Sequence, residues 1–250
     1  MPRVTQGRRA PFRASLRRAV RLFLDFRHEQ DDPARFYTAL ADDSVAQLGR
    51  YVDLTGRVVL DVGGGPGYYR NAFSAAGATY YALDADVGEL SGLGEIASGT
   101  VIGSGMQLPF ADGSVDVCYS SNVLEHVRDP WRMADEMVRV TRRGGVVFLS
   151  YTVWFGPWGG HETAPWHYVG GARARRRYTR RHGHEPKNKF GESLFPVLVR
   201  DGLRWAATQQ HGDVLDVVPR YNPRWTYWLL RVPALRELLT WNLVIVLRRR

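Results

Sequence analysis

The sequence has a single cysteine, only two lysines and no long uncharged apolar run. Because Cys118 has no second cysteine to pair with, a disulfide-stabilised secreted domain is excluded, and we expect an intracellular, cytoplasmic protein. The longest uncharged stretch, residues 144–160, is too short and too interrupted by glycine and proline to cross a bilayer. The N-terminus also lacks the apolar core and small-residue cleavage site of a signal peptide.

The composition is that of one large domain with additions. The chain has 250 residues, of which 44% are hydrophobic and 12% aromatic. That is enough apolar material to bury a sizeable core, and we find no internal repeat.

The net charge of +9 is concentrated in three segments. Residues 1–24 carry seven arginines and no acid, residues 172–190 carry eight lysines or arginines and one glutamate, and the last three residues are arginines. The rest of the chain is therefore acidic, which favours attachment surfaces around an acidic body.

Two of these basic segments leave alternatives open. Residues 12–27 place apolar side chains at helical spacing with arginines on the other face: Phe12, Leu16, Val20, Phe23 and Leu24. Such a helix can fold over a ligand site, lie on an anionic membrane surface, or belong to a disordered tail. Residues 172–190 fit a solvated helix, a grip on a substrate or lipid phosphate, or a nucleic-acid contact.

Strands and helices alternate through the middle of the chain. Apolar runs predict strands over residues 58–62, 79–84, 100–104, 115–120 and 146–152, with helices over 68–76 and 131–142. This order predicts an α/β fold: a doubly wound, Rossmann-like, mostly parallel seven-stranded sheet with an antiparallel edge strand. The last two strands are expected at 213–218 and 241–248, with a helix over 193–203 and a helical piece over 224–239 bent near Pro233.

Two additions surround the predicted sheet. We expect residues 1–54, which also hold a second helix over 34–52, to form an N-terminal basic helical cap on a domain of residues 55–250. Residues 153–190 are rich in Trp, Gly, His and Arg with weak periodicity, which predicts a lid inserted after the fifth strand.

The stretch DVGGGPGYY, residues 61–69, has four glycines in five positions directly after the first predicted strand. Glycines there let the backbone approach a ligand closely, and the following helix offers free N–H groups. A P-loop is excluded because no lysine follows. A dinucleotide fingerprint fails because its third glycine position holds Tyr68. The pattern is D-x-G-x-G-x-G.

With these glycines the sequence resembles the class I S-adenosylmethionine-dependent methyltransferases. Asp84 ends the second strand at the family's spacing, QLPFADGSVDVCYSSNVLEHV at 107–127 matches the region of the fourth strand, and GGVVFLS matches the entry to the fifth. The resemblance covers residues 55–152. Within this family the sequence is most similar to small-molecule methyltransferases of the quinone and natural-product type, including uncharacterised actinobacterial members. We expect residues 55–250 to be the methyltransferase domain.

The resemblance implies S-adenosyl-L-methionine as cofactor and S-adenosyl-L-homocysteine as product. Asp84 would accept hydrogen bonds from the ribose hydroxyls, and Ser104 or backbone near Met106 would bind the adenine, because Ser104 and Gly105 replace the usual Asp-Ala. The implied cofactor-binding residues are Asp61, Gly63, Gly64, Gly65, Gly67, Asp84, Ala85, Ser104, Gly105, Met106, Ser120 and Asn122. Simpler structural roles stay open for four of them: Asp61 bracing the loop, Asp84 capping the strand, Met106 packing in the core, and Asn122 capping a helix.

His126, in Leu124-Glu125-His126-Val127, is the candidate catalytic base, because a neutral imidazole suits deprotonation of a hydroxyl. Stacking beside the cofactor or capping a loop are the alternatives. In the predicted lid we assign His161, His167 and Tyr168 to the acceptor pocket. The spacing of His161, Glu162, His167, His182 and His184 does not match a tight ligand set, so we expect no metal.

Taken with the resemblance, these features predict a methyltransferase of the EC 2.1.1 type that O-methylates an apolar or glycosylated small molecule or lipid. The aromatic residues Tyr151, Trp154, Phe155 and Trp158 suit an apolar acceptor, or alternatively pack the lid onto the sheet. Two rivals stay open: an RNA methyltransferase using the arginine-rich segments, and an inactive cofactor-binding scaffold. No RNA-binding signature accompanies the charge, so we do not expect a nucleic-acid partner. A peripheral contact with the inner face of the membrane is compatible with the basic helix.

Overall fold

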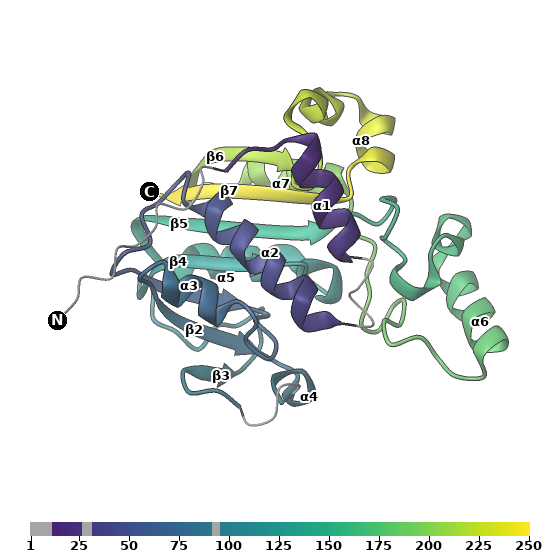
Figure 1. Cartoon of the computed structure of the whole chain (residues 1–250), viewed down its shortest axis with the longest axis horizontal. Helices are drawn as coiled ribbons and strands as arrows, with labels where there is room; N and C mark the ends of the chain where they lie inside the picture. The colour runs from purple at the N-terminus through teal and green to yellow at the C-terminus, as the bar shows by residue number, and fades with distance from the viewer. Residues whose placement is uncertain (1–11, 27–31, 92–95) are drawn as a thin grey trace.

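In the computed structural model, residues 12–26, 32–91 and 96–250 are described, and they form one seven-stranded sheet with helices on both faces (Figure 1). The strand order is β3-β2-β1-β4-β5-β7-β6. The strands are β1 (Val58–Val62), β2 (Thr79–Asp84), β3 (Thr100–Ile102), β4 (Val115–Ser121), β5 (Thr141–Thr152), β6 (Gly212–Pro219) and β7 (Asn242–Arg249). Parts of the predicted cap, residues 1–11 and 27–31, lie outside the described residues.

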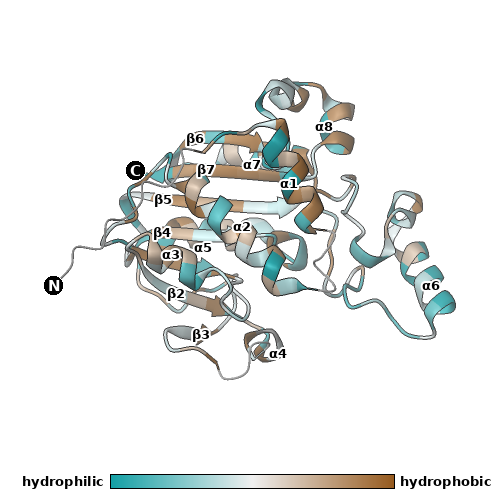
Figure 2. Cartoon of the chain, in the orientation of Figure 1, coloured by the Kyte–Doolittle hydropathy of each residue, from teal (hydrophilic) through white to brown (hydrophobic). Residues whose placement is uncertain are grey.

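The predicted doubly wound, mostly parallel sheet is confirmed. Strands β1 to β5 pair in parallel. Strand β7 lies between β5 and the edge strand β6 and is antiparallel to both. Central strands are buried on both faces, which explains why their sequences are continuous apolar runs rather than alternating ones (Figure 2).

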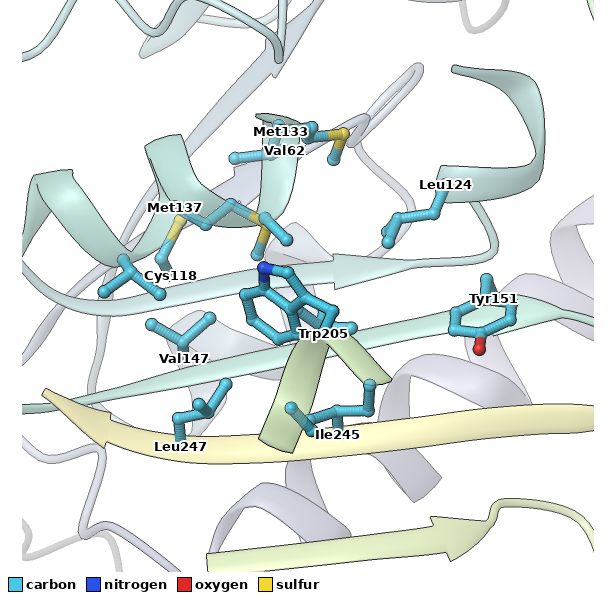
Figure 3. Close-up of a cluster of buried hydrophobic side chains, with 14 of the residues drawn as sticks. Val62, Cys118, Leu124, Met133, Met137, Val147, Tyr151, Trp205, Ile245 and Leu247 are labelled. Carbon is cyan, nitrogen blue, oxygen red and sulfur yellow. The ribbon is translucent and has the colours of Figure 1, made fainter. Parts of the chain in front are cut away.

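Helices cover the two faces of the sheet and create one core on each. On one face α2 (Pro33–Leu48) and α3 (Arg70–Ala75) pack against a cluster that includes Tyr119, Phe148 and Val244. On the other face lie α5 (Pro130–Val140) and α7 (Val199–Thr208), whose side chains Met133, Met137 and Trp205 meet those of the strands in Figure 3. Such fully buried side chains stabilise the fold by about 1.5–3 kcal/mol each.

Local sequence signals set where the two longest of these helices begin. Asp32 and Asp129 stand before α2 and α5, and each carboxylate accepts a hydrogen bond from the N–H three residues on. A proline follows each cap at the first helical position, where its missing N–H is harmless.

The remaining elements lie outside the central layers. The short α4 (Val87–Leu90) follows β2, and the turn η1 (Leu124–His126) follows β4. After β5 come η2 (His161–Thr163), η3 (Trp166–Val169) and α6 (Gly171–His182), and α6 stands away from the sheet, beyond the carboxyl ends of the parallel strands (Figure 1). Between β6 and β7 lie η4 (Arg224–Arg231) and α8 (Pro233–Leu239).

One local expectation is corrected. The helix expected over 193–203 starts only at Val199, because Pro196 cannot donate an intrahelical hydrogen bond, and residues 195–198 before it form no helix. The first helix, α1 (Leu16–Phe26), exposes apolar side chains of the stripe that the sequence showed: Leu16, Val20 and Leu24 are 59%, 48% and 49% exposed. Arg18 is buried instead.

Buried electrostatics determine how α1 docks. The guanidinium of Arg18 donates two hydrogen bonds of 2.6 Å to the carboxylate of Asp43 on α2, and a third of 2.7 Å to the carbonyl of Arg220. Because these groups lie under α1, its Arg18 face turns inward, and Leu16, Val20 and Leu24 face outward, whereas Phe23 packs on Trp158 and Trp241. None of the described helices has the length and hydropathy that crossing a bilayer requires.

Candidate active site

The strand order reverses between β1 and β4, and the candidate site is built around the loops that leave these two strands. In open α/β sheets this reversal point, at the carboxyl ends of the strands, is where ligands bind. The glycine loop follows β1, and η1 follows β4.

The glycine loop requires glycine for two different reasons. Gly63 has a φ of 80°, and a Cβ on it would lie 2.4 Å from Val123 Cγ2, so the packing of Val123 leaves no room for a side chain here. Gly65 has a φ of 50°, but a Cβ on it would meet nothing within 4 Å. The backbone at Gly65 therefore faces open space, as a loop that receives a ligand must. Gly67 also has a positive φ, of 89°.

Asp84, at the end of β2, is joined to this loop. Its Oδ2 accepts a hydrogen bond of 3.0 Å from the Gly65 N–H, and its Oδ1 accepts one of 3.0 Å from the Asp86 N–H beyond Ala85. A carboxylate has about four acceptor positions, so each oxygen retains capacity for another donor. The arrangement suits a side chain that holds paired hydroxyl groups.

Asp61 lies below the loop rather than at its surface. Its side chain is buried, and its Oδ2 accepts a hydrogen bond of 2.6 Å from the Tyr80 hydroxyl. Burial raises the pKa of Asp61 to about 7, and the charge of Asp84 adds to the rise, while the Tyr80 hydrogen bond opposes it. A Cβ on Gly64 would lie 3.2 Å from Asp61 Cγ, so Asp61 supports the loop from beneath.

The segment after β3 is fixed against α5. Ser104 Oγ accepts a hydrogen bond of 3.2 Å from the Met106 N–H, and the Met106 carbonyl accepts one of 3.0 Å from Arg132 Nε. A Cβ on Gly105 would lie 3.0 Å from Met133 Sδ. This close packing explains a glycine there and holds the backbone of 104–106 beside the end of β1.

Ser120 and Asn122 are engaged within the protein. Ser120 is fully buried, and its hydroxyl donates a hydrogen bond of 2.8 Å to the Val62 carbonyl, which ties β4 to β1. Asn122 has a φ of 57°, and its side-chain carbonyl accepts a hydrogen bond of 2.6 Å from Asn242 Nδ2. Both residues stabilise the carboxyl ends of the strands.

His126 is held in a defined orientation. Its Nδ1 lies 2.8 Å from the Ser193 carbonyl, which can only accept, so Nδ1 carries a proton and, in the neutral ring, Nε2 has the lone pair. This Nε2 lies 3.2 Å from Nε2 of His161, and the two rings are stacked with centroids 5.0 Å apart. Burial, and next the neighbouring His126, lower the pKa of His161 to about 3, so this imidazole stays neutral.

Glu125 completes a cluster that the sequence spacing did not reveal. Its side chain is 2% exposed, and Oε1 accepts a hydrogen bond of 3.0 Å from the Thr152 N–H. Oε2 is buried with no hydrogen-bond partner among the described residues. One ligand atom each from Glu125, His126 and His161 lies within 4.8 Å of the others. The only signal in the sequence was the adjacency of Glu125 and His126.

The other histidines of the predicted lid do not join this cluster. His167 is 1% exposed and packs edge-on against Trp154, and burial lowers its pKa. Tyr168 is largely exposed beside it. His182 and His184 lie at the end of α6 around Tyr178. Of the three residues assigned to the acceptor pocket, only His161 contacts His126.

The aromatic run after β5 is used in packing. Tyr151 and Trp154 are buried, and the Tyr151 hydroxyl donates a hydrogen bond of 2.9 Å to the Leu198 carbonyl. Trp158 packs on Phe26 of α1, with ring centroids 4.9 Å apart. These contacts join the segment after β5 to the sheet and to α1.

A separate groove of about 730 Å³ runs along α6. It is lined by the apolar side chains Trp166, Val169 and Ala174 and by five arginines, Arg173, Arg176, Arg177, Arg180 and Arg181. The guanidinium of Arg177 lies over the Trp166 ring, 3.9 Å from its centroid. The lining therefore combines apolar and cationic side chains, and the groove lies along α6, away from the reversal point of the sheet.

Comparisons with known proteins agree with this geometry. Residues 60–149 match the protein family described as "Methyltransferase domain". The chain is 53% identical over 251 residues to an uncharacterised methyltransferase of Mycobacteroides abscessus, covering 95% of this chain and 96% of that protein. It is 55% identical over 245 residues to one of Mycobacterium tuberculosis, covering 94% and 96%.

Solved structures share the fold. An S-adenosylmethionine-dependent methyltransferase from Mesorhizobium loti is similar with a TM-score of 0.56 at 18% identity, covering 84% of this chain and 98% of that one. One from Archaeoglobus fulgidus has a TM-score of 0.57 at 12% identity, covering 90% and 99%.

Proposed function

Since the chain belongs to the S-adenosylmethionine-dependent methyltransferases, we propose that it methylates a hydroxyl oxygen of an apolar or glycosylated small molecule or lipid. Its cofactor, S-adenosylmethionine, supplies a methyl group on a positively charged sulfur. The protein must then align the acceptor with that methyl group and exclude water, and alignment alone contributes up to about 7–11 kcal/mol.

The loop after β1 and Asp84 are the residues that we assign to the cofactor. The open backbone at Gly65 would receive its amino-acid portion, and Asp84 would accept hydrogen bonds from its ribose hydroxyls. The pinned backbone of 104–106 would border the adenine. Ser120 and Asp61 would act indirectly, because their side chains hold β1, β2 and β4 together beneath the site.

We assign the acceptor's proton to His126. The Ser193 carbonyl fixes the proton on Nδ1, so Nε2 has the lone pair that a general base needs. As the oxygen–methyl bond forms and the methyl–sulfur bond breaks, the hydroxyl proton passes to Nε2. The orientation of this imidazole is the single observation on which O-methylation, rather than methylation of carbon, depends.

An exposed apolar stripe on a basic helix supports a lipid-like acceptor. Leu16, Val20 and Leu24 face outward on α1, flanked by the exposed Arg17 and Arg21. Trp225 and Trp228 of η4 are 70% and 51% exposed, and a backbone hydrogen bond of 2.8 Å from Arg224 to Ala14 links the start of η4 to the approach to α1. Basic helices with exposed apolar residues bind anionic membrane surfaces.

The acceptor is tested by supplying labelled S-adenosylmethionine with lipid and glycoside extracts. We expect label in an apolar or glycosylated product, and a loss of about 10²–10⁴-fold in kcat for His126→Ala. Full activity of His126→Ala would remove the proposed base. Label appearing only in RNA would replace this function by RNA methylation.

Membrane contact is tested by sedimentation with phosphatidylglycerol vesicles. The triple variant of Leu16, Val20 and Leu24 to Ser should lose most of its vesicle binding, because the stripe is removed while the arginines remain. Ile102→Ser, at an exposed residue on the opposite edge of the sheet, serves as the control. Equal sedimentation of the triple variant and the wild type would contradict the contact.

A further inference from the structure

We propose that Glu125, His126 and His161 form a binding site for one divalent transition-metal cation of the zinc class. The proposal rests on the proposed function and deepens it: the cation would hold the acceptor oxygen at the methyl-transfer site. Val123, directly before η1, contacts the position of Gly63 in the glycine loop, so the cluster lies next to the loop assigned to the cofactor.

The geometry of the two imidazoles fits such a cation. Two nitrogens bound to a tetrahedral zinc at about 2.0–2.1 Å lie about 3.3–3.4 Å apart. Nε2 of His126 and Nε2 of His161 are 3.2 Å apart. All three ligand atoms lie within 4.8 Å of one another, so the Glu125 side chain would need only a small shift to complete the set.

The buried carboxylate of Glu125 is the second, independent observation. The side chain is 2% exposed, and Oε2 has no hydrogen-bond partner among the described residues. Leaving a buried carboxylate oxygen unpartnered costs free energy, because its hydration is lost without replacement. A cation between the carboxylate and the two imidazoles would satisfy this oxygen.

The surroundings of the histidines prepare them as ligands. The Ser193 carbonyl holds the His126 proton on Nδ1 and so directs the Nε2 lone pair at the cluster, the usual arrangement for a metal-bound histidine. His161 has a φ of 46°, a left-handed backbone that is uncommon outside glycine and is maintained where a side chain must be aimed. It directs the His161 ring onto that of His126.

The ligand chemistry selects the cation. Two imidazoles and one carboxylate suit zinc and its neighbours, whereas magnesium prefers oxygen ligands in an octahedral shell. Three protein ligands leave the fourth coordination position of a tetrahedral cation for an oxygen of the methyl acceptor. With the cation bound, Nε2 of His126 would be a ligand and would no longer be the base assigned above. The cation would instead lower the pKa of the acceptor hydroxyl, whose proton would pass to solvent, and the resulting oxyanion would form the oxygen–methyl bond as the methyl–sulfur bond breaks.

The site is tested by metal binding to the full chain after dialysis against a chelator. We expect calorimetry to show one Zn²⁺ bound per chain, and Co²⁺ to give the visible absorption of a tetrahedral site. His161→Gln should weaken Zn²⁺ binding at least 100-fold. Glu125→Gln should also weaken it, but Glu125 also accepts the structural hydrogen bond from the Thr152 N–H, so His161→Gln is the deciding variant.

His211→Gln, at an exposed histidine in the turn before β6, is the matched control and should bind Zn²⁺ as the wild type does. Absence of Zn²⁺ binding to the wild type, equal binding by His161→Gln, or binding of Mg²⁺ in preference to Zn²⁺ would each overturn the proposal. Titration of S-adenosylhomocysteine into the same samples separates the two proposals, because its failure to bind would contradict the cofactor site and leave the metal result intact.

Discussion

The backbone N–H of Gly65 donates a hydrogen bond to Oδ2 of Asp84 over 3.0 Å. This contact joins the loop after β1 to the end of β2 at the side of the sheet where the strand order reverses. It brings the open backbone of Gly65 and the carboxylate of Asp84 into one site, so that one ligand can contact both.

Gly65→Ala should weaken cofactor binding strongly while it reduces the stability of the fold only slightly. A Cβ at Gly65 meets no atom of the protein, so the substitution should cost only the strain of a left-handed alanine, about 1–2 kcal/mol of unfolding free energy. The same methyl group would stand where the cofactor approaches, and we expect affinity for S-adenosylhomocysteine to fall at least tenfold in calorimetry.

Gly56→Ala is the matched control for this prediction. Gly56 has a φ of 70° and equally open surroundings, but it lies in the turn before β1, away from the site. It should lose similar stability and retain full affinity. Equal affinity in both variants would mean that the cofactor does not approach Gly65.

Asp43→Asn should loosen α1. The change leaves the guanidinium of Arg18 buried without its counter-charge, close to the fully buried Arg220, and such a loss costs about 3–5 kcal/mol. We expect a matching fall in unfolding free energy by urea titration, with faster hydrogen exchange across residues 16–26. Asp25→Asn, in the longer pair of 3.7 Å between the half-buried Asp25 and the exposed Arg35, should cost less than about 1 kcal/mol. Similar losses in the two variants would contradict the buried anchor.

Asp61→Asn should change how stability depends on pH. Burial raises the pKa of Asp61 to about 7 from its usual value of 3.8, so between these pH values the folded chain retains a proton that the unfolded chain has released. Folding is therefore favoured at low pH. This contribution to the free energy of unfolding falls by on the order of 4 kcal/mol as pH rises from about 4 to about 7, and it then levels off.

The asparagine variant lacks this titration but can still accept the Tyr80 hydrogen bond. Urea unfolding across pH 4 to 8 should show the wild type losing stability relative to the variant as pH rises. Parallel pH profiles for the two proteins would mean that Asp61 is ionised throughout.

The sheet could be predicted from the sequence because its signals are local. Apolar runs set β1, β2 and β4, and the glycines mark where β1 turns into the following helix. Val-, Ile- and Leu-rich strands buried on both faces form such runs in any parallel sheet. The cofactor class followed from residues close together in sequence, Asp61 to Gly67 and Asp84.

The features that could not be predicted depend on contacts between distant segments. Arg18 and Asp43 decide which face of α1 is buried, and no periodicity in α1 contains that information. His126 and His161 lie together where the backbone of His161 is left-handed, and no pattern in the sequence predicts that conformation. Spacing rules for metal sites therefore gave no signal for the Glu125 cluster.

Titration of S-adenosylhomocysteine into Asp84→Asn tests the central claim most directly. Hydrogen bonds to a charged carboxylate contribute about 1.5–3 kcal/mol each, so losing two to the ribose should weaken binding about 100-fold or more. Asp53→Asn, which changes a carboxylate that also accepts a backbone N–H in a turn, should bind as the wild type. If Asp84→Asn bound with wild-type affinity, the cofactor would not lie against the end of β2.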